Sequence, residues 1–197
     1  MNTFSLNLTL KQNPYSEEPH SEYEIWGEII LKLNQNPSKS IEILNHQWDI
    51  LEVYEWFQKN KAALLTESFP FYFEDEKCMA QSRDVLYEKK DFKDLNEEFE
   101  YYDTIENYFS THHFKLKGTD TPMLFIGLKN HRGEVSWFDE KSRVYNYFSF
   151  NMGDFIKAAE NEFAALLNKW QKSNDVENLK ILRRIKEIEN SWQQYEK

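Results

Sequence analysis

The spacing of hydrophobic side chains changes along this sequence, and that change limits the folds open to the chain. Residues 3–10 alternate strictly between apolar and polar side chains, which is the pattern of a half-buried strand. Residues 23–33 repeat the alternation as a second strand, and a turn at residues 34–38, which contains Pro37, separates it from a short third strand at residues 41–44. The N-terminal part of the chain is therefore predicted to form a sheet.

Helical spacing replaces this alternation in two regions. A helix is expected to begin at Asp49, which can cap it while Glu52 returns the bond, and to end before Pro70. The C-terminal third is predicted to be helical, with a first helix capped by Asn151 or Asp154 and a second one after residues 173–175. Their apolar faces hold Ile156, Ala159, Phe163, Leu166, Leu167 and Trp170 in the first helix and Ile181, Ile185, Ile188, Trp192 and Tyr195 in the second.

A β-hairpin is predicted at residues 122–138, where two apolar arms flank a turn at residues 130–133. Gly133 is expected to supply a positive φ in that turn. Residues 144–150 form a further predicted strand. Strands at the start and middle, with helices between and after them, predict an α+β fold in which a mostly antiparallel sheet packs with several helices. The length of 197 residues suits a single domain spanning residues 1–197.

Negative charge is concentrated in residues 67–106. Helices are expected near residues 77–90 and 93–112, where the apolar periodicity is weak. Residues 67–106 hold 13 Asp or Glu against 5 Lys or Arg, whereas the whole chain has a net charge of −10. Binding to nucleic acid or to an anionic membrane surface is not expected of such a chain, because both need clustered Lys and Arg. A basic protein partner would be attracted instead.

Composition indicates a folded protein of a reducing compartment. Hydrophobic residues make up 40% of the chain and aromatic residues 16%, so a stable core needs no disulfide. Cys78 is the single cysteine, which excludes an internal disulfide. The first twenty residues lack the basic and apolar regions of a secretory signal, and no apolar run reaches the roughly 20 residues that span a bilayer. A cytoplasmic location is therefore expected.

Motifs for chemistry are weak, and no catalytic, cofactor-binding or metal-binding residue is predicted. Cys78 lies among acidic residues that disfavour a reactive thiolate. The adjacent His112 and His113 point in different directions, so a helix end where cationic histidine is mildly favoured is the preferred interpretation. Residues 74–76 lack the glycine of a calcium loop, and the chain has no glycine-rich phosphate loop. The last helix has a basic face, which is expected to be solvated: Lys180, Arg183, Arg184 and Lys186.

Aromatic residues interleave with the acidic ones near residue 100, and this segment is the candidate for partner binding. Tyrosine and phenylalanine anchor protein interfaces, while carboxylates steer a basic partner toward them. The alternative is that the aromatic side chains fill the core while the acidic ones stay in water. The candidate partner-binding residues are Glu97, Glu98, Phe99, Glu100, Tyr101, Tyr102 and Asp103.

In size, charge and the acidic-aromatic segment at residues 96–103, the chain resembles the immunity proteins of bacterial polymorphic toxin systems. The resemblance implies a protein that inhibits a toxin by occluding its active site, with carboxylates pairing with basic residues and aromatic residues anchoring the contact. Two alternatives remain: an enzyme with dispersed catalytic residues, and a structural subunit whose C-terminal helices pair with another copy.

Overall fold

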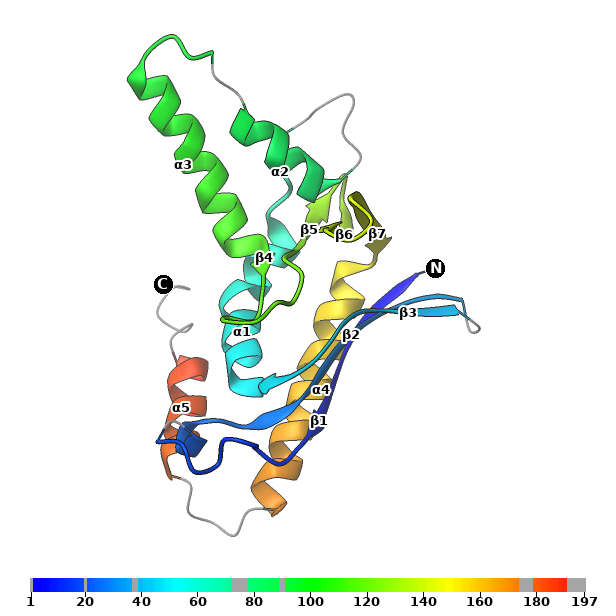
Figure 1. Ribbon diagram of the computed structural model, residues 1–197, viewed down its shortest axis with the longest axis vertical. Coiled ribbons are helices and arrows are strands. Elements are labelled where there is room, and N and C mark those ends of the chain that lie inside the picture. Colours follow the sequence, from blue (N-terminus) through cyan, green and yellow to red (C-terminus); the bar gives the residue numbers. More distant parts are fainter. Residues whose placement is uncertain are drawn as a thin grey trace. The chain divides into compact units, whose positions relative to one another are not determined.

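The computed structural model describes residues 2–19, 21–36, 39–71, 78–88, 91–173 and 179–190 (Figure 1). They form helices and antiparallel strands, which confirms the predicted α+β fold with a helical C-terminal third. In chain order the elements are β1 (Thr3–Leu10), η1 (Ser21–Tyr23), β2 (Trp26–Asn36), β3 (Lys39–Asp49), α1 (Ile50–Thr66), α2 (Met79–Glu88), α3 (Leu95–His112), β4 (His113–Phe114), β5 (Leu124–Lys129), β6 (Arg132–Asp139), β7 (Val144–Phe150), α4 (Met152–Ser173) and α5 (Leu179–Asn190).

The chain forms two compact units. Unit 1 comprises Met1–Lys61 and Gly153–Lys197, and unit 2 comprises Ala62–Met152. The division falls within α1 and at the start of α4, and each unit contains one of the two sheets. The expectation of a single domain stays a prediction.

Unit 1 contains a three-stranded antiparallel sheet in the order β1-β2-β3. The predicted strand at residues 3–10 is confirmed as β1, and its alternating residues Phe4, Leu6 and Leu8 are buried. The second strand begins at Trp26 rather than at residue 23. Tyr23 lies in the short helix η1 and is 43% exposed, so the predicted start of this strand is wrong.

The third strand of this sheet, β3, is longer than the sequence predicts. It runs from Lys39 to Asp49 and pairs with β2 along its length. The apolar alternation covers only residues 41–44, whereas residues 45–47 are polar. Pairing with β2 supplies the backbone hydrogen bonds that hold this polar half as a strand.

The helices of unit 1 follow the predicted patterns. The Asp49 side chain accepts a hydrogen bond from the Leu51 N–H (3.0 Å), which confirms Asp49 as the cap of α1, and α1 ends before Pro70. The predicted apolar faces of α4 and α5 are buried at Ile156, Ala159, Phe163, Leu166, Trp170, Ile181, Ile185 and Ile188. Trp192 and Tyr195 lie outside the described residues.

Unit 2 contains a four-stranded antiparallel sheet in the order β4-β5-β6-β7. The hairpin predicted at residues 122–138 is confirmed as β5 and β6, and the strand predicted at residues 144–150 is confirmed as β7. The predicted role of Gly133 is wrong. The turn consists of Asn130 and His131, with φ of 52° and 62°. Gly133 lies in β6, where a Cβ atom would be 2.8 Å from the Phe150 ring. This glycine is needed for close packing and not for a turn.

The two helices predicted in the acidic stretch are present as α2 and α3, which lie beside each other in unit 2 (Figure 1). One apolar cluster joins them to the sheet through Cys78, Met79, Ala80, Leu86, Ile105, Tyr108, Phe109 and Phe125. Within the described parts of the chain, none of the helices combines the length and the apolar character that crossing a membrane requires.

Candidate functional site

The acidic-aromatic segment forms the first turns of α3, and its start is fixed by local hydrogen bonds. The Asp94 side chain accepts bonds from the N–H groups of Asn96 (2.9 Å) and Glu97 (3.0 Å). Glu97 in turn accepts a bond from the Lys93 N–H (2.8 Å). Carboxylates at a helix N-terminus also interact favourably with its dipole. Asp94 and Glu97 therefore serve the helix itself.

The two tyrosines of the segment face the interior of unit 2. Tyr101 donates its hydroxyl hydrogen to the Leu86 carbonyl (3.1 Å) and contacts the rings of Phe71 and Phe92. Tyr102 stacks against the ring of Tyr87, with centroids 6.1 Å apart. Both side chains are half-buried. The side chains of Tyr101 and Tyr102 therefore pack against other residues of unit 2.

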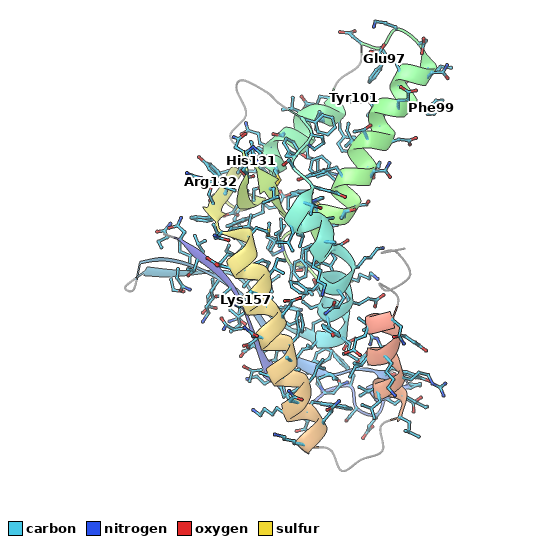
Figure 2. The ribbon with its side chains drawn as sticks, turned by 180° about the vertical axis from the view of Figure 1, so that it is seen from behind. Glu97, Phe99, Tyr101, His131, Arg132 and Lys157 are labelled. Carbon is cyan, nitrogen blue, oxygen red and sulfur yellow. The ribbon has the colours of Figure 1, made fainter. Side chains whose placement is uncertain are left out.

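Phe99 behaves differently from its aromatic neighbours. It is 65% exposed, and Leu95, one turn earlier, is 68% exposed. Positions four apart lie on one face of a helix, so Leu95, Phe99 and Asp103 form one stripe. Figure 2 shows Phe99 and Tyr101 leaving α3 on opposite sides. A large apolar side chain exposed among carboxylates is the feature that a core-filling role does not explain.

Carboxylates surround this exposed apolar pair. Glu100, Asp103 and Glu106 are exposed, and Glu97 and Glu98 are half-exposed. The helix contains no Lys or Arg, and within the residues that the structure describes no ion pair involves a carboxylate of α3. Glu106 accepts a hydrogen bond from the Tyr87 hydroxyl. We define the α3 outer face as Leu95, Phe99, Glu100 and Asp103.

A buried carboxylate in unit 2 could not be foreseen from the sequence. Glu134 of β6 is 4% exposed and accepts a hydrogen bond from the Met79 N–H (2.7 Å), while the Ser136 hydroxyl oxygen accepts one from the Ala80 N–H (3.1 Å). Burial raises the pKa of Glu134, and the Met79 N–H opposes that shift. These two side chains cap α2 from the sheet, so the unusual environment of Glu134 has a structural explanation.

The histidine pair lies at the end of α3, as expected, but the surroundings of both rings disfavour the cationic form. His112 is fully buried, donates from Nδ1 to the Tyr108 carbonyl (2.8 Å) and stacks on the Tyr108 ring at 3.9 Å. Burial lowers the pKa values of both His112 and His113, which favours the neutral ring. The described side chains contain no group of three residues able to hold a metal ion.

Cys78 is fully buried in the apolar cluster of unit 2, and burial raises the pKa of its thiol. Both effects disfavour the thiolate that a nucleophile requires. Residues 74–76, the other carboxylate group considered above, lie outside the described residues.

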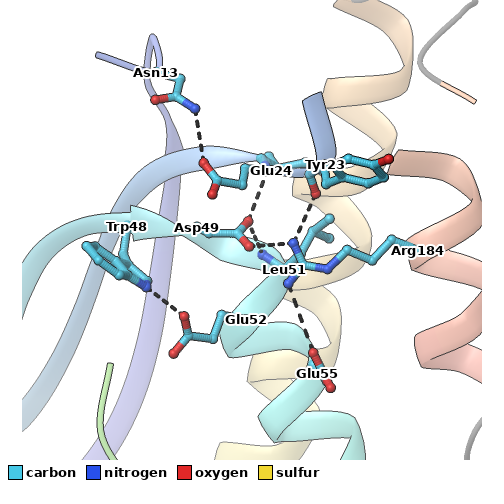
Figure 3. Close-up of polar contacts among 10 residues, drawn as sticks. Asn13, Tyr23, Glu24, Trp48, Asp49, Leu51, Glu52, Glu55 and Arg184 are labelled. Atoms are coloured by element: carbon cyan, nitrogen blue, oxygen red, sulfur yellow. Dashed lines mark hydrogen bonds and ion pairs between the residues drawn. The ribbon is translucent and has the colours of Figure 1, made fainter. Parts of the chain in front are cut away.

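The basic face of α5 is not simply solvated, which corrects the sequence-based expectation. Arg184 donates from Nη1 to the Asp49 carboxylate (2.6 Å) and to the Tyr23 carbonyl (2.9 Å), as Figure 3 shows. Asp49 also accepts a bond from the Ile25 N–H (3.1 Å). Burial raises the pKa of Asp49, and the Arg184 guanidinium opposes the shift. Lys180 pairs with Glu22. Two of the four cations therefore pair with carboxylates of unit 1.

No protein-family model, curated protein or solved structure matches this chain.

Proposed function

We propose that this chain is a binding protein that captures a basic protein partner through the α3 outer face. One observation carries the proposal: Phe99 is 65% exposed on a helix whose acidic side chains have no ion-pair partner among the described residues. An exposed Phe within reach of an adjacent Leu gives a partner an apolar anchor. The carboxylates around it give the partner's lysines and arginines a complementary rim.

The carboxylates and the Phe99 ring are expected to contribute to binding in different ways. Carboxylates at the rim raise the rate of encounter with a cationic surface and favour one orientation, and salt weakens this effect. Burial of the Phe99 ring supplies affinity that persists at high salt, because removing apolar surface from water does not depend on charge. The complex should therefore form more slowly as salt rises, while its dissociation changes less.

The finer form of the proposal is that the partner is a toxin, which the chain neutralises by covering its active site. Toxins that act on nucleic acids have basic active-site surfaces, since their substrates are polyanions. Helix α3, with carboxylates around an aromatic anchor, would offer such a toxin a negatively charged surface. The toxin's own substrate is negatively charged as well. The resemblance to immunity proteins supports this form.

Paired charge reversals test the proposal. The immobilised chain, an E100K/D103K variant and an E17K/E18K variant would be compared for capture of basic proteins from the native host, followed by affinity measurement with each purified partner. Glu17 and Glu18 are exposed in unit 1, so the second variant has the same net charge change away from α3.

We expect E100K/D103K to weaken binding of the partner by about a hundredfold, since each reversed contact contributes about 1.4 kcal/mol, and E17K/E18K to bind like the wild type. Equal losses in both variants would indicate attraction by bulk charge alone, and unchanged binding by E100K/D103K would exclude the α3 outer face. For the toxin form, co-expression of the chain should restore growth to cells that produce the captured partner.

A further inference from the structure

A second surface, in unit 1, is independent of the α3 outer face and begins with the free edge of β1. Among the described strands, β1 pairs with β2 and with no other. The Lys11 N–H donates to the Trp26 carbonyl (3.0 Å), directly beyond the pair of Leu10 and Gly27. Because inward and outward backbone groups alternate in an antiparallel ladder, Leu6, Leu8 and Leu10 direct their N–H and C=O groups away from the sheet.

The bond that Leu8 makes agrees with this alternation. Its N–H donates to the Glu162 carboxylate of α4 (2.8 Å), a side chain that here occupies the place of a neighbouring strand's carbonyl. The two elements run in the same direction, since Phe4 stacks on Phe155 at 4.6 Å near the start of each. Helix α4 therefore follows the open edge of β1.

A hollow separates the strand edge from the helix. Its volume is about 160 Å³, and it is lined by residues 8–10 of β1 and by Glu162, Ala165, Leu166 and Lys169 of α4. A cavity of about 150 Å³ holds a benzene molecule, so this hollow can accept a side chain.

We infer that this groove binds an extended peptide segment, which adds to β1 as a fourth strand and places a lysine or arginine opposite Glu162. Strand addition beside a helix satisfies outward backbone groups of the edge strand, and alternate side chains of the added strand enter the groove. When a peptide carbonyl takes over the Leu8 N–H, the released Glu162 carboxylate requires a new partner. Lys169 lines the same hollow but lies about two helical turns beyond Glu162. A cationic side chain that enters beside Leu8 is therefore the nearer partner for Glu162, and this charge complementarity defines the occupant.

The test uses the full chain and the synthetic peptide acetyl-Thr-Val-Thr-Lys-Thr-Val-Thr-amide, whose valines and lysine share one face. Backbone amide NMR spectra recorded during titration should show saturable shifts at Leu6, Leu8 and Leu10. Replacement of the peptide lysine by norleucine, or N-methylation of alternate peptide bonds, should weaken binding by about fivefold or more, the equivalent of one hydrogen bond or ion pair.

Two pairs of protein variants locate the contact. E162Q keeps an acceptor for the Leu8 N–H but removes the charge, so it should lose the preference for lysine over norleucine, whereas the exposed control E187Q should keep it. L10P removes an outward N–H without breaking the ladder, and L10A removes the side chain while keeping the N–H. We expect L10P to bind about fivefold more weakly than L10A.

Several outcomes would overturn the inference. Absence of saturable shifts, shifts confined to unit 2, or equal binding of the N-methylated peptide would each show that no strand adds to β1. A doubling of molecular mass in E162Q without peptide would mean that a second copy of the chain occupies the edge instead. If L10P fails to fold, the comparison of parent and N-methylated peptides on the wild-type chain still decides.

Discussion

The helices α3 and α5 are both strongly charged, and their charges have different structural roles. On α5, Arg184 contacts Asp49 and Tyr23, and Lys180 pairs with Glu22. On α3, the charges of the outer face have no ion-pair partner within the described parts of the chain. A run of like charge in a sequence therefore indicates neither a binding surface nor a solvated one until its partners are known.

The largest expected effect is on α5. R184A should lower the free energy of unfolding by about 3 kcal/mol, because it leaves the Asp49 carboxylate buried beside an empty position. R183A changes an exposed neighbour on the same helix and should remain within about 0.5 kcal/mol of the wild type. Urea unfolding of the two variants measures the difference. Similar losses in both would mean that the contact of Arg184 with Asp49 contributes no more than a surface charge.

A second effect separates two aromatic residues of α3. Y101A should cost about 2 kcal/mol of stability, since it removes ring contacts with Phe71 and Phe92 and the hydrogen bond to Leu86. F99A should change stability by less than about 0.5 kcal/mol, because the ring is mostly in water. In partner binding the order should reverse, with F99A causing the greater loss at a temperature where both variants are folded. A strong loss of stability in F99A would show that Phe99 belongs to the core.

The smallest effect concerns Glu134, whose buried carboxylate contrasts with the exposed ones of α3. Its pKa is raised from 4.5 in the folded protein, so the folded state binds this proton more tightly than the unfolded state. The contribution of Glu134 to stability is therefore full below pH 4.5 and falls as the pH rises through the raised pKa.

E134Q retains an acceptor for the Met79 N–H without the charge. Relative to the wild type, its unfolding free energy should improve between acidic and neutral pH, which thermal melts across that range would measure. E100Q, at an exposed position of α3, is the matched control. If the two variants keep a constant difference from the wild type at every pH, the carboxyl of Glu134 does not titrate differently on folding.

Local sequence patterns were sufficient to predict the strands and helix ends that local interactions determine. The alternation of residues 3–10 gave β1, and Asp49 capped α1 as expected. Gly133 was wrongly predicted as the turn residue because glycine is the commonest source of positive φ. Here Asn130 and His131 adopt the positive φ instead. Asparagine and histidine tolerate this region better than most residues, and that signal was present in the sequence.

The candidate site was predictable only in part. The sequence located the acidic-aromatic segment, but it could not separate the exposed Phe99 from the internal Tyr101, because that depends on which side of α3 meets α2. The contacts of Glu134 with Met79 and of Arg184 with Asp49 join residues 55 and 135 positions apart. Pairings at such separations arise from the fold as a whole and leave no local periodicity.

The cap that β6 provides for α2 also has a consequence for the order of folding. Helix α2 has only 10 residues, and isolated helices shorter than about 12–15 residues are marginal in water. The first N–H groups of α2 find their acceptors on Glu134 and Ser136 of β6. The β5–β6 hairpin closes through a two-residue turn and can form early, on the microsecond scale. Helix α2 should therefore become stable only after that hairpin exists, so its side chains should have low φ-values in the folding transition state.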